Sequence, residues 1–296
     1  MKSGLAINTR LCYASAWKHF GIWCARAERV QLPALPSTVE DFAAWCIGEE
    51  FRLRTVTIRL NAIAHYHRQA GLDSPIDSAV RGFMENARRN LKEAPGGKAA
   101  VTRFHIAEIA KRLSKTPVEI RNRTMILLNF ASGWRRSEIT GLEYSDISFV
   151  EQGMTLWLRS SKTDQKAKGR LVGIHRGRVA LTCPVRAIKE WLAIRGTWDG
   201  PLFVRFSPQQ QLTREGLSHR GEALYWALKS ALEQLGEDPQ RFGAHSLRAG
   251  MITEAVKHGA SEASIKMRTG HRSSESLQLY IRPAKLFDMN PMRAVL

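Results

Sequence analysis

Cysteine is scarce in this chain and is not arranged for metal binding or for pairing. The four cysteines are Cys12, Cys24, Cys46 and Cys183, and no two of them form a CxxC pair. Structural zinc sites and disulfide frameworks require closely spaced or paired cysteines. The sequence therefore predicts neither.

Long apolar runs are also absent. No stretch approaches the length of a membrane-spanning helix, and the start, MKSGLAINTR, contains only the short run GLAI where a signal peptide needs a longer one. We expect a cytoplasmic protein without membrane contact.

Acidic residues are few relative to basic ones. The chain has 45 Lys and Arg against 27 Asp and Glu, a formal net charge of +18, and the basic residues recur along its whole length. Such a balance favours a polyanionic partner, and nucleic acid is favoured over an anionic membrane because no membrane segment is expected. With 296 residues and 44% hydrophobic content, the chain is long enough for about two globular domains.

The usual hydrolytic motifs are missing. The sequence has no GxSxG, HExxH or Walker motif, and no carboxylate cluster typical of two-metal nucleases. It does have arginines and histidines close in sequence to residues with hydroxyl groups that could act as nucleophiles. Such cations can stabilise the charge on a phosphodiester under attack without a metal ion.

The hydrophobic pattern divides the chain in two. Residues 1–91 are expected to be entirely helical, and residues 92–102, which contain Pro95, Gly96 and Gly97, are expected to form a linker. Residues 103–296 are predicted to be mostly helical with three short strands between residues 147 and 175. A capping box is expected at residues 37–40, STVE, ahead of a helix.

One helix of the first domain, within residues 51–72, carries many basic residues. Val56, Leu60 and Ile63 form its apolar stripe. Its other face and its entry are expected to present four DNA-binding arginines: Arg52, Arg54, Arg59 and Arg68. The alternative is that this face is only solvated surface.

The most informative stretch begins at residue 245: HSLRAGMITEAVKHGASEASIKMRTGHRSSESLQLYIRP. A helix is expected from near Ser246 to Gly259, with His245 and Arg248 at its first turn, where backbone N–H groups favour an anion. A second helix should end at Gly270.

That second helix would deliver His271, and a third would project Tyr280. Taken singly, each of these residues is more often structural. The evidence is their joint spacing, because His271 follows Arg248 by 23 residues and Tyr280 follows His271 by nine.

This pattern resembles the tyrosine recombinase (phage integrase) family, whose signature is HxxR, then Gly-His or Gly-Trp, then a nucleophilic tyrosine nine residues later. Upstream, GWRRSEITGL, residues 133–142, resembles the first arginine box of the family, so Arg135 corresponds to a catalytic arginine and Glu138 to the supporting acid. Lys162, in SSKTD, corresponds to the strand-turn lysine.

The likeness extends over the whole chain, and the helical first domain is most similar to Cre-type recombinases. Two positions depart from the pattern: Ala249 replaces a second histidine of many members, and His271 replaces the tryptophan of Cre-like members.

The resemblance implies an all-helical core-binding domain followed by an α+β catalytic domain. Tyr280 would attack a DNA phosphate to form a 3′-phosphotyrosine, while Arg135, Arg248 and His271 bind the nonbridging oxygens. Lys162 would protonate the leaving 5′-oxygen, and His245 would assist proton transfer. The covalent link conserves the bond energy, so no metal, ATP or other cofactor is expected.

The implied partner is duplex DNA with paired half-sites, bound by a homotetramer whose C-terminal tails, PAKLFDMNPMRAVL, are exchanged between protomers. Two alternatives stay open. One is a non-catalytic DNA-binding protein that keeps the fold, and the other is a type IB topoisomerase.

Overall fold

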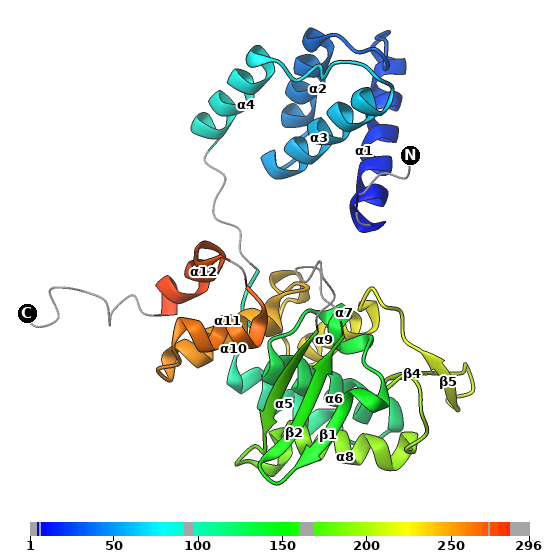
Figure 1. The fold of residues 1–296 in the computed structure, drawn as a ribbon, viewed down its shortest axis with the longest axis vertical. Coiled ribbons are helices and arrows are strands. Elements are labelled where there is room, and N and C mark those ends of the chain that lie inside the picture. Colours follow the sequence, from blue (N-terminus) through cyan, green and yellow to red (C-terminus); the bar gives the residue numbers. More distant parts are fainter. Residues whose placement is uncertain (1–4, 6, 92–97, 160–168, 272, 285–296) are drawn as a thin grey trace, which may run out of the picture. The chain divides into compact units, whose positions relative to one another are not determined.

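The computed structural model describes residues 5, 7–91, 98–159, 169–271 and 273–284. The chain forms two compact units, Met1–Gly96 and Gly97–Leu296 (Figure 1). Their boundary falls inside the range expected for the linker.

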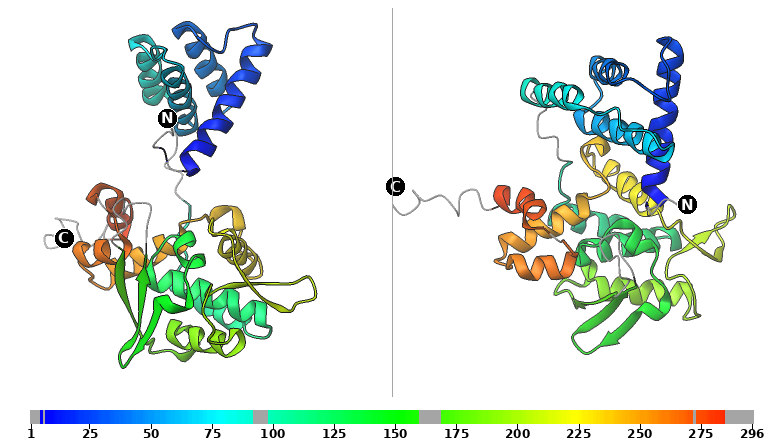
Figure 2. Two further views of the ribbon diagram at one scale, coloured as in Figure 1. Left: turned by 45° about the vertical axis from the view of Figure 1, so that its right-hand side comes forward. Right: turned by 45° about the horizontal axis from the view of Figure 1, so that its top comes forward.

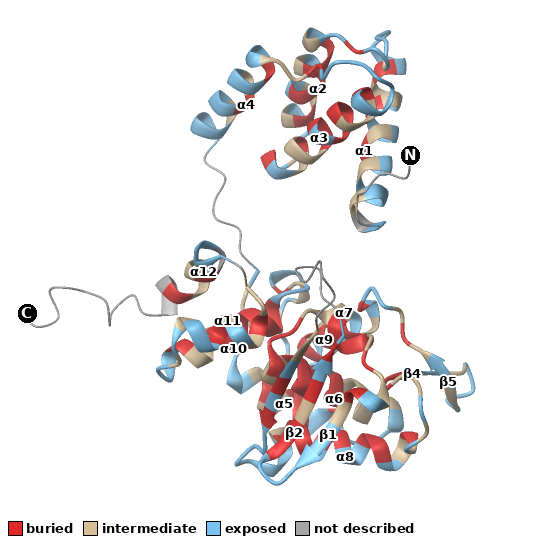
Figure 3. Cartoon of the chain, in the orientation of Figure 1, coloured by how far each residue is buried: buried red, intermediate tan, exposed pale blue. Residues whose placement is uncertain are grey.

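The first unit contains four helices: α1 (Ile7–Arg26), α2 (Pro36–Gly48), α3 (Leu53–Gln69) and α4 (Ser78–Asn90). Phe20 of α1, Phe42 of α2, and Val56 and Ile63 of α3 are fully buried in its core. Figure 3 shows this buried side of the helices in red. The described residues of this unit contain no strand, as the sequence predicted.

The predicted capping box at residues 37–40 is wrong. Helix α2 already begins at Pro36, its N-cap is Leu35, and no side chain caps it. Proline at the first helical position has a preset backbone angle and lacks an N–H that would need a partner, so the helix starts two residues earlier than the box implies, without a serine cap.

Part of the expected linker belongs to the second unit. The backbone N–H of Ala99 donates to the carbonyl oxygen of Arg241 at 2.7 Å, and that of Val101 donates to Ser246 at 3.0 Å. Val101 is fully buried in the core. Residues 98–102 are therefore fixed to the catalytic unit, whereas residues 92–97 lie outside the described residues.

The second unit is mostly helical. Its helices are α5 (Arg103–Arg112), α6 (Pro117–Ser132), α7 (Arg136–Thr140), α8 (Pro184–Arg195), α9 (Glu222–Glu233), α10 (Ser246–Lys257), α11 (Glu262–Thr269) and α12 (Ser274–Ala284). Short 3₁₀ helices cover Tyr144–Asp146, Ala180–Thr182 and Pro239–Arg241. This agrees with the predicted helical segments, whose ends are marked by Gly133, Gly196 and Gly270.

The three predicted strands form one antiparallel sheet. They are β1 (Ile147–Val150), β2 (Gly153–Leu158) and β3 (Arg170–His175), in the order β1-β2-β3. Leu156 of β2 pairs with Val172 of β3, and both are buried, as is Ile174, while Leu171 is exposed. One face of the sheet thus joins the core that contains α6 and α8.

A second hairpin was not predicted. It pairs β4 (Val204–Phe206) with β5 (Leu212–Gly216), and the register shifts between Val204 and Phe206. Both strands are short, and their sequences, VRF and LTREG, do not show an extended alternation of apolar and polar residues.

Helices α10, α11 and α12 gather on one side of the second unit in all views of Figures 1 and 2. They share a small core of their own, which includes Ile252, Ile265, Leu277 and Ile281. Through α10 this group is fixed to α6, because α10 packs against α6 as well as against α12. None of the helices, as far as the chain is described, is long and apolar enough to cross a membrane.

Candidate active site

The site is built around the turn that follows α6. Gly133 ends α6 with φ +65°, in the left-handed region that favours glycine. An added Cβ would lie 2.0 Å from Cε of Met251, so any other residue here would have to displace that side chain and adopt a strained φ. Asn129, in the last turns of α6, stabilises the turn because its side-chain amide donates to the carbonyl oxygen of Trp134 at 2.9 Å.

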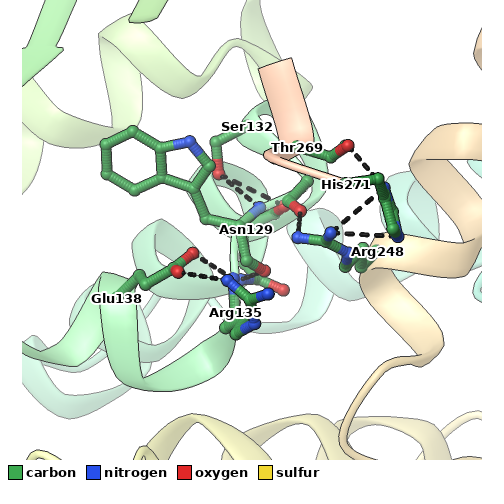
Figure 4. Close-up of polar contacts among 9 residues, drawn as sticks. Asn129, Ser132, Arg135, Glu138, Arg248, Thr269 and His271 are labelled. Carbon is green, nitrogen blue, oxygen red and sulfur yellow. Dashed lines mark hydrogen bonds and ion pairs between the residues drawn. The ribbon is translucent and has the colours of Figure 1, made fainter. Parts of the chain in front are cut away.

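The turn delivers Arg135 to the start of α7, where it is held by Glu138. The carboxylate of Glu138 accepts from the backbone N–H of Arg135 at 2.8 Å and from its Nη1 at 2.7 Å (Figure 4). The Glu138 side chain is only 5% exposed, and that of Arg135 is 20% exposed. The buried carboxylate orients Arg135 while part of its guanidinium stays accessible.

Arg248 reaches the same turn from α10. It is buried, its Nη1 donates to the carbonyl oxygen of Gly133 at 2.9 Å, and its Nη2 lies 3.0 Å from Nε2 of His271. Burial, followed by repulsion from Arg135, lowers the pKa of Arg248 to about 10. The group remains charged at neutral pH.

His271 enters from the end of α11. Gly270 terminates this helix with φ +70°, so the chain turns and presents the imidazole to Arg248. Oγ1 of Thr269 lies 2.6 Å from Nδ1 of His271. Burial, and then repulsion by Arg248 and Arg135, lowers the pKa of His271 to about 4, so the imidazole is neutral at physiological pH.

His245 stands directly before α10, as predicted. Its pKa is lowered by loss of hydration and by the positive charges of Arg248, Arg135 and Arg136. The residue is exposed at the surface, so we attribute more of this effect to the three guanidinium groups than to burial.

Tyr280 lies on α12, half-buried against the small core of α10 and α11. It is near enough to Arg248 to affect the pKa of that guanidinium. Among the described residues its hydroxyl has no hydrogen-bond partner. Lys162 lies outside the described residues, so its place in the site stays a prediction.

Sequence reasoning missed two residues of the site. Arg170, the first residue of β3, lowers the pKa of both Arg248 and His271. Its guanidinium lies against Gly270. Thr269 is fully buried beside His271. Their sequence positions carry no signal, because only the packing of β3 and α11 brings them here.

The four arginines expected to bind DNA do not share one surface. Arg52, Arg54 and Arg68 are exposed, but Arg59 is buried. Its guanidinium lies 3.9 Å from the centre of the Phe51 ring, and its Nη1 donates to Sγ of Cys46 at 3.2 Å. Arg59 follows Val56 by three residues and so lies on the buried stripe, which corrects its expected place on the exposed face.

The arrangement concentrates positive charge around one small space. Arg135 and Arg248 carry the charge, and the neutral His245 and His271 lie beside them; the four residues come from three separate segments, and the Glu138 carboxylate pairs with Arg135. The described residues contain no group of three or more potential metal ligands. Chemically, the cluster is suited to a phosphate oxyanion.

Residues 100–286 match the model of the phage integrase family. The chain belongs to this family. It is 30% identical to the integrase/recombinase xerD homolog of Selenomonas ruminantium, over 99% of this chain and 86% of that protein. It is also 24% identical to the recombinase cre of Escherichia phage P1, over 90% of this chain and 82% of that one.

Solved structures share the fold of this family member. A lambda integrase dimer bound to a core site, of residues 75–356, matches with a TM-score of 0.63 at 16% identity, over 95% of this chain and 90% of that one. The Tn1549 transposon integrase in complex with transposon right end DNA matches with a TM-score of 0.67 at 13% identity, over 97% and 95%. The chain is a site-specific tyrosine recombinase, an enzyme that transfers DNA strands.

Proposed function

We propose that Tyr280 is the nucleophile of this recombinase and that Arg135, Arg248 and His271 bind the nonbridging oxygens of the attacked phosphate. The observation that carries the proposal is the meeting of two guanidinium groups, those of Arg135 and Arg248, with the neutral imidazole of His271 at the turn after α6, beside the helix that bears Tyr280. Glu138 orients Arg135 through its two hydrogen bonds.

The reaction proceeds by in-line displacement at phosphorus. Oη of Tyr280 forms a bond to phosphorus, and the bond from phosphorus to the 5′-oxygen breaks. The phenol proton leaves toward His245, and Lys162 gives a proton to the departing 5′-oxygen. A 3′-phosphotyrosine and a free 5′-hydroxyl result, and attack by a 5′-hydroxyl of the partner duplex reverses the step. The number of phosphoester bonds is unchanged, so this reaction requires no energy from ATP.

The neutral state of His245 supports its role in proton transfer. The surrounding guanidinium groups keep its pKa low, so an unprotonated nitrogen is available at neutral pH. A general base must have such a nitrogen.

The family membership does not favour the alternatives of a non-catalytic DNA-binding protein or a type IB topoisomerase. We place the reaction on duplex DNA with paired half-sites, in the cytoplasm of a bacterial host and within a homotetramer. Solved relatives support this assembly, since lambda integrase is a tetramer on a Holliday junction.

The proposal also includes exchange of the C-terminal tail between protomers. The tail, residues 285–296, lies outside the described residues, but its sequence contains Leu286, Phe287 and Met289. The catalytic unit offers an apolar pocket of about 660 Å³. Its lining includes the apolar residues Phe130, Leu171, Val172, Met251, Ile265 and Met267, with Arg103, Glu254 and Arg268 among the others.

Met267 is 77% exposed and Leu171 is 62% exposed, so this pocket presents apolar surface that a neighbour's tail could cover. Truncation after Ala284 should leave binding of one protomer to a half-site nearly intact and should abolish cooperative filling of the second. Tetrameric synapses of the truncated protein, seen on native gels or by light scattering, would rule out the exchange.

The catalytic assignment is tested with a nicked suicide duplex that carries the protein's own site, identified by sequencing DNA trapped on the protein. The wild type should form an SDS-resistant adduct and Tyr280→Phe should form none. An adduct that persists in this variant would show that another residue is the nucleophile.

Arg136 provides the control for the arginine box. Its guanidinium lies over the ring of Tyr225 and does not pair with Glu138. Loss of Arg136 should therefore affect cleavage much less than loss of Arg135. Equal losses of cleavage would mean that the arginine box has been aligned wrongly by one residue.

A further inference from the structure

Thr269 occupies a special place at the end of α11. Its side chain is fully buried, and its hydroxyl lies 2.7 Å from the carbonyl oxygen of Ile265 and 2.6 Å from Nδ1 of His271 (Figure 4). A Cβ added to Gly133 would lie 3.2 Å from its methyl group, so the methyl packs beside that turn. Packing thus fixes the side chain with its hydroxyl toward His271.

The hydrogen bonds around His271 determine which ring nitrogen carries the proton. Nη2 of Arg248 lies 3.0 Å from Nε2 and 3.2 Å from Nδ1 of His271, so this guanidinium can donate to whichever ring nitrogen is unprotonated. The hydroxyl of Thr269 selects between them: its one proton goes to the carbonyl oxygen of Ile265, which can only accept, so Oγ1 accepts from Nδ1. Nε2 then accepts from Arg248, and this chain of bonds is complete only for the neutral imidazole with a proton on Nδ1.

We propose that Thr269 is a positioning residue that selects the tautomer of His271 and lets the neutral imidazole change from acceptor to donor when a phosphate binds. The catalytic part of this inference rests on the role proposed above for His271. The hydroxyl has one proton and can turn it either toward Ile265 or toward Nδ1.

When a phosphate enters, the N–H of Arg248 turns to its oxygens and Nε2 faces an anion. The imidazole then loses the proton on Nδ1 to solvent and takes up one from solvent on Nε2, with no net change in charge. The hydroxyl of Thr269 rotates to donate to Nδ1, and the N–H at Nε2 donates to a nonbridging oxygen. A valine at position 269 could support neither arrangement.

The alternative route to a donor at Nε2 is full protonation of His271. The charged groups that face it oppose a further positive charge: they are Arg248 from α10, Arg135 from the start of α7 and Arg170 from β3, and the neutral His245 would add to them if it gained a proton. Glu138, the carboxylate of this site, is already bonded to Arg135. A change of tautomer avoids this repulsion.

Two variants separate the hydroxyl from the packing of Thr269. Thr269→Val keeps the shape and removes the hydroxyl, whereas Thr269→Ser keeps the hydroxyl and removes the methyl group. The full chain is labelled with ¹⁵N-histidine, and the His271 resonances are assigned by their loss in His271→Gln.

In the wild type and Thr269→Ser, we expect the proton on Nδ1 at neutral pH. In Thr269→Val, the proton should shift toward Nε2. An unchanged tautomer in Thr269→Val would overturn the inference and would leave the proposed function intact.

The same variants are compared in single-turnover cleavage of the suicide duplex. Residues that orient an acting histidine typically contribute about 10-fold to 100-fold in metal sites, and we expect a loss of about 10-fold for Thr269→Val, an altered pH profile, and an unchanged DNA affinity. Thr269→Ser should cleave within about 2-fold of the wild type by the same argument.

A double variant identifies the route of the effect. In the His271→Gln background, Thr269→Val should cause no further loss of cleavage, because the hydroxyl acts through His271. Additive losses would overturn the positioning role. Wild-type cleavage by His271→Gln alone would instead refute the proposed function of His271, while the NMR result would still test the hydrogen-bond chain.

Discussion

Two buried arginines of the catalytic unit differ in how many of their N–H groups the protein itself binds. Arg195, at the end of α8, is 2% exposed and makes five hydrogen bonds. The acceptors are the carbonyl oxygens of Gly196, Trp198, Gly200 and Pro201, and the guanidinium also stacks on Trp198 at 3.8 Å.

Arg248 is similarly buried but has fewer partners in the part of the chain that the structure describes. It donates to the carbonyl oxygen of Gly133 and to the imidazole of His271. An arginine has five N–H donors, so Arg195 is saturated by the protein while Arg248 retains donors for a ligand. The two arginines are similarly buried, but they differ in the number of N–H donors that are not bound by the protein, as far as the structure describes it.

The largest effect that tests this contrast is on catalysis. Arg248→Gln should reduce cleavage of the suicide duplex by about 100-fold to 1,000-fold, as expected for loss of one oxyanion donor. DNA affinity should change little, and the free energy of unfolding should fall by no more than about 1–3 kcal/mol, because only the carbonyl oxygen of Gly133 loses a buried donor and the cluster loses a repelling charge. A large fall in the free energy of unfolding alongside the loss of cleavage would show that Arg248 has a mainly structural role.

Arg195 should show the opposite behaviour. Arg195→Met removes the guanidinium donor from four half-buried carbonyl groups, of which only Gly200 keeps another donor among the described residues, the N–H of Tyr144, and a buried unsatisfied group costs about 1–3 kcal/mol. We expect the free energy of unfolding, measured with urea, to fall by about 3 kcal/mol or more. Cleavage per folded molecule should stay near the wild-type rate, and a large loss of that rate would weaken the contrast.

The pH dependence of stability tests the charge on the cluster. The pKa of His271 is lowered from 6.5 to about 4 in the folded state, so the unfolded chain binds a proton first as the pH falls. The stability contributed by neutral His271 is present above pH 6.5 and is lost between pH 6.5 and about 4. Urea titrations should show a flatter dependence in this window for His271→Gln, and parallel curves would contradict the shift.

The arginines of the first unit also differ in whether they are exposed or buried, and smaller effects are expected there. Replacing exposed Arg54 and Arg68 by alanine should lower DNA affinity and reduce the magnitude of its salt slope by about 2, one phosphate contact for each. Arg59→Met should instead destabilise the first unit with little change in slope, since Arg59 is buried on Phe51. An unchanged affinity and slope for the double variant would mean that the exposed face is only solvated.

Much of the fold was predictable because its signals are local. Glycines at positions 133, 196 and 270 mark where helices end, and alternating burial in β3 follows its alternating sequence. The β4–β5 hairpin lacks such a pattern and depends on its contacts. Arg59 was misplaced because charge was taken as a sign of exposure, although helical spacing put it beside Val56 and Ile63.

The site was predictable in part for a different reason. The spacing of Arg248, His271 and Tyr280 is a family signature, so these residues could be named without knowing how they meet. The buried hydroxyl of Thr269 and the nearby Arg170 have no such signature. Their importance depends on distances between α11, β3 and α10, which arise only when the chain folds.

The bond from Arg248 to Gly133 joins residues that are 115 positions apart. During synthesis, α6 and the Arg135 turn leave the ribosome long before α10, and α12 with Tyr280 comes later still. Domains generally fold as units once their chain has emerged. A partly made chain would therefore hold the helices of the first unit but not the cluster of Arg135, Arg248 and His271, which assembles only after α10 and α11 have emerged.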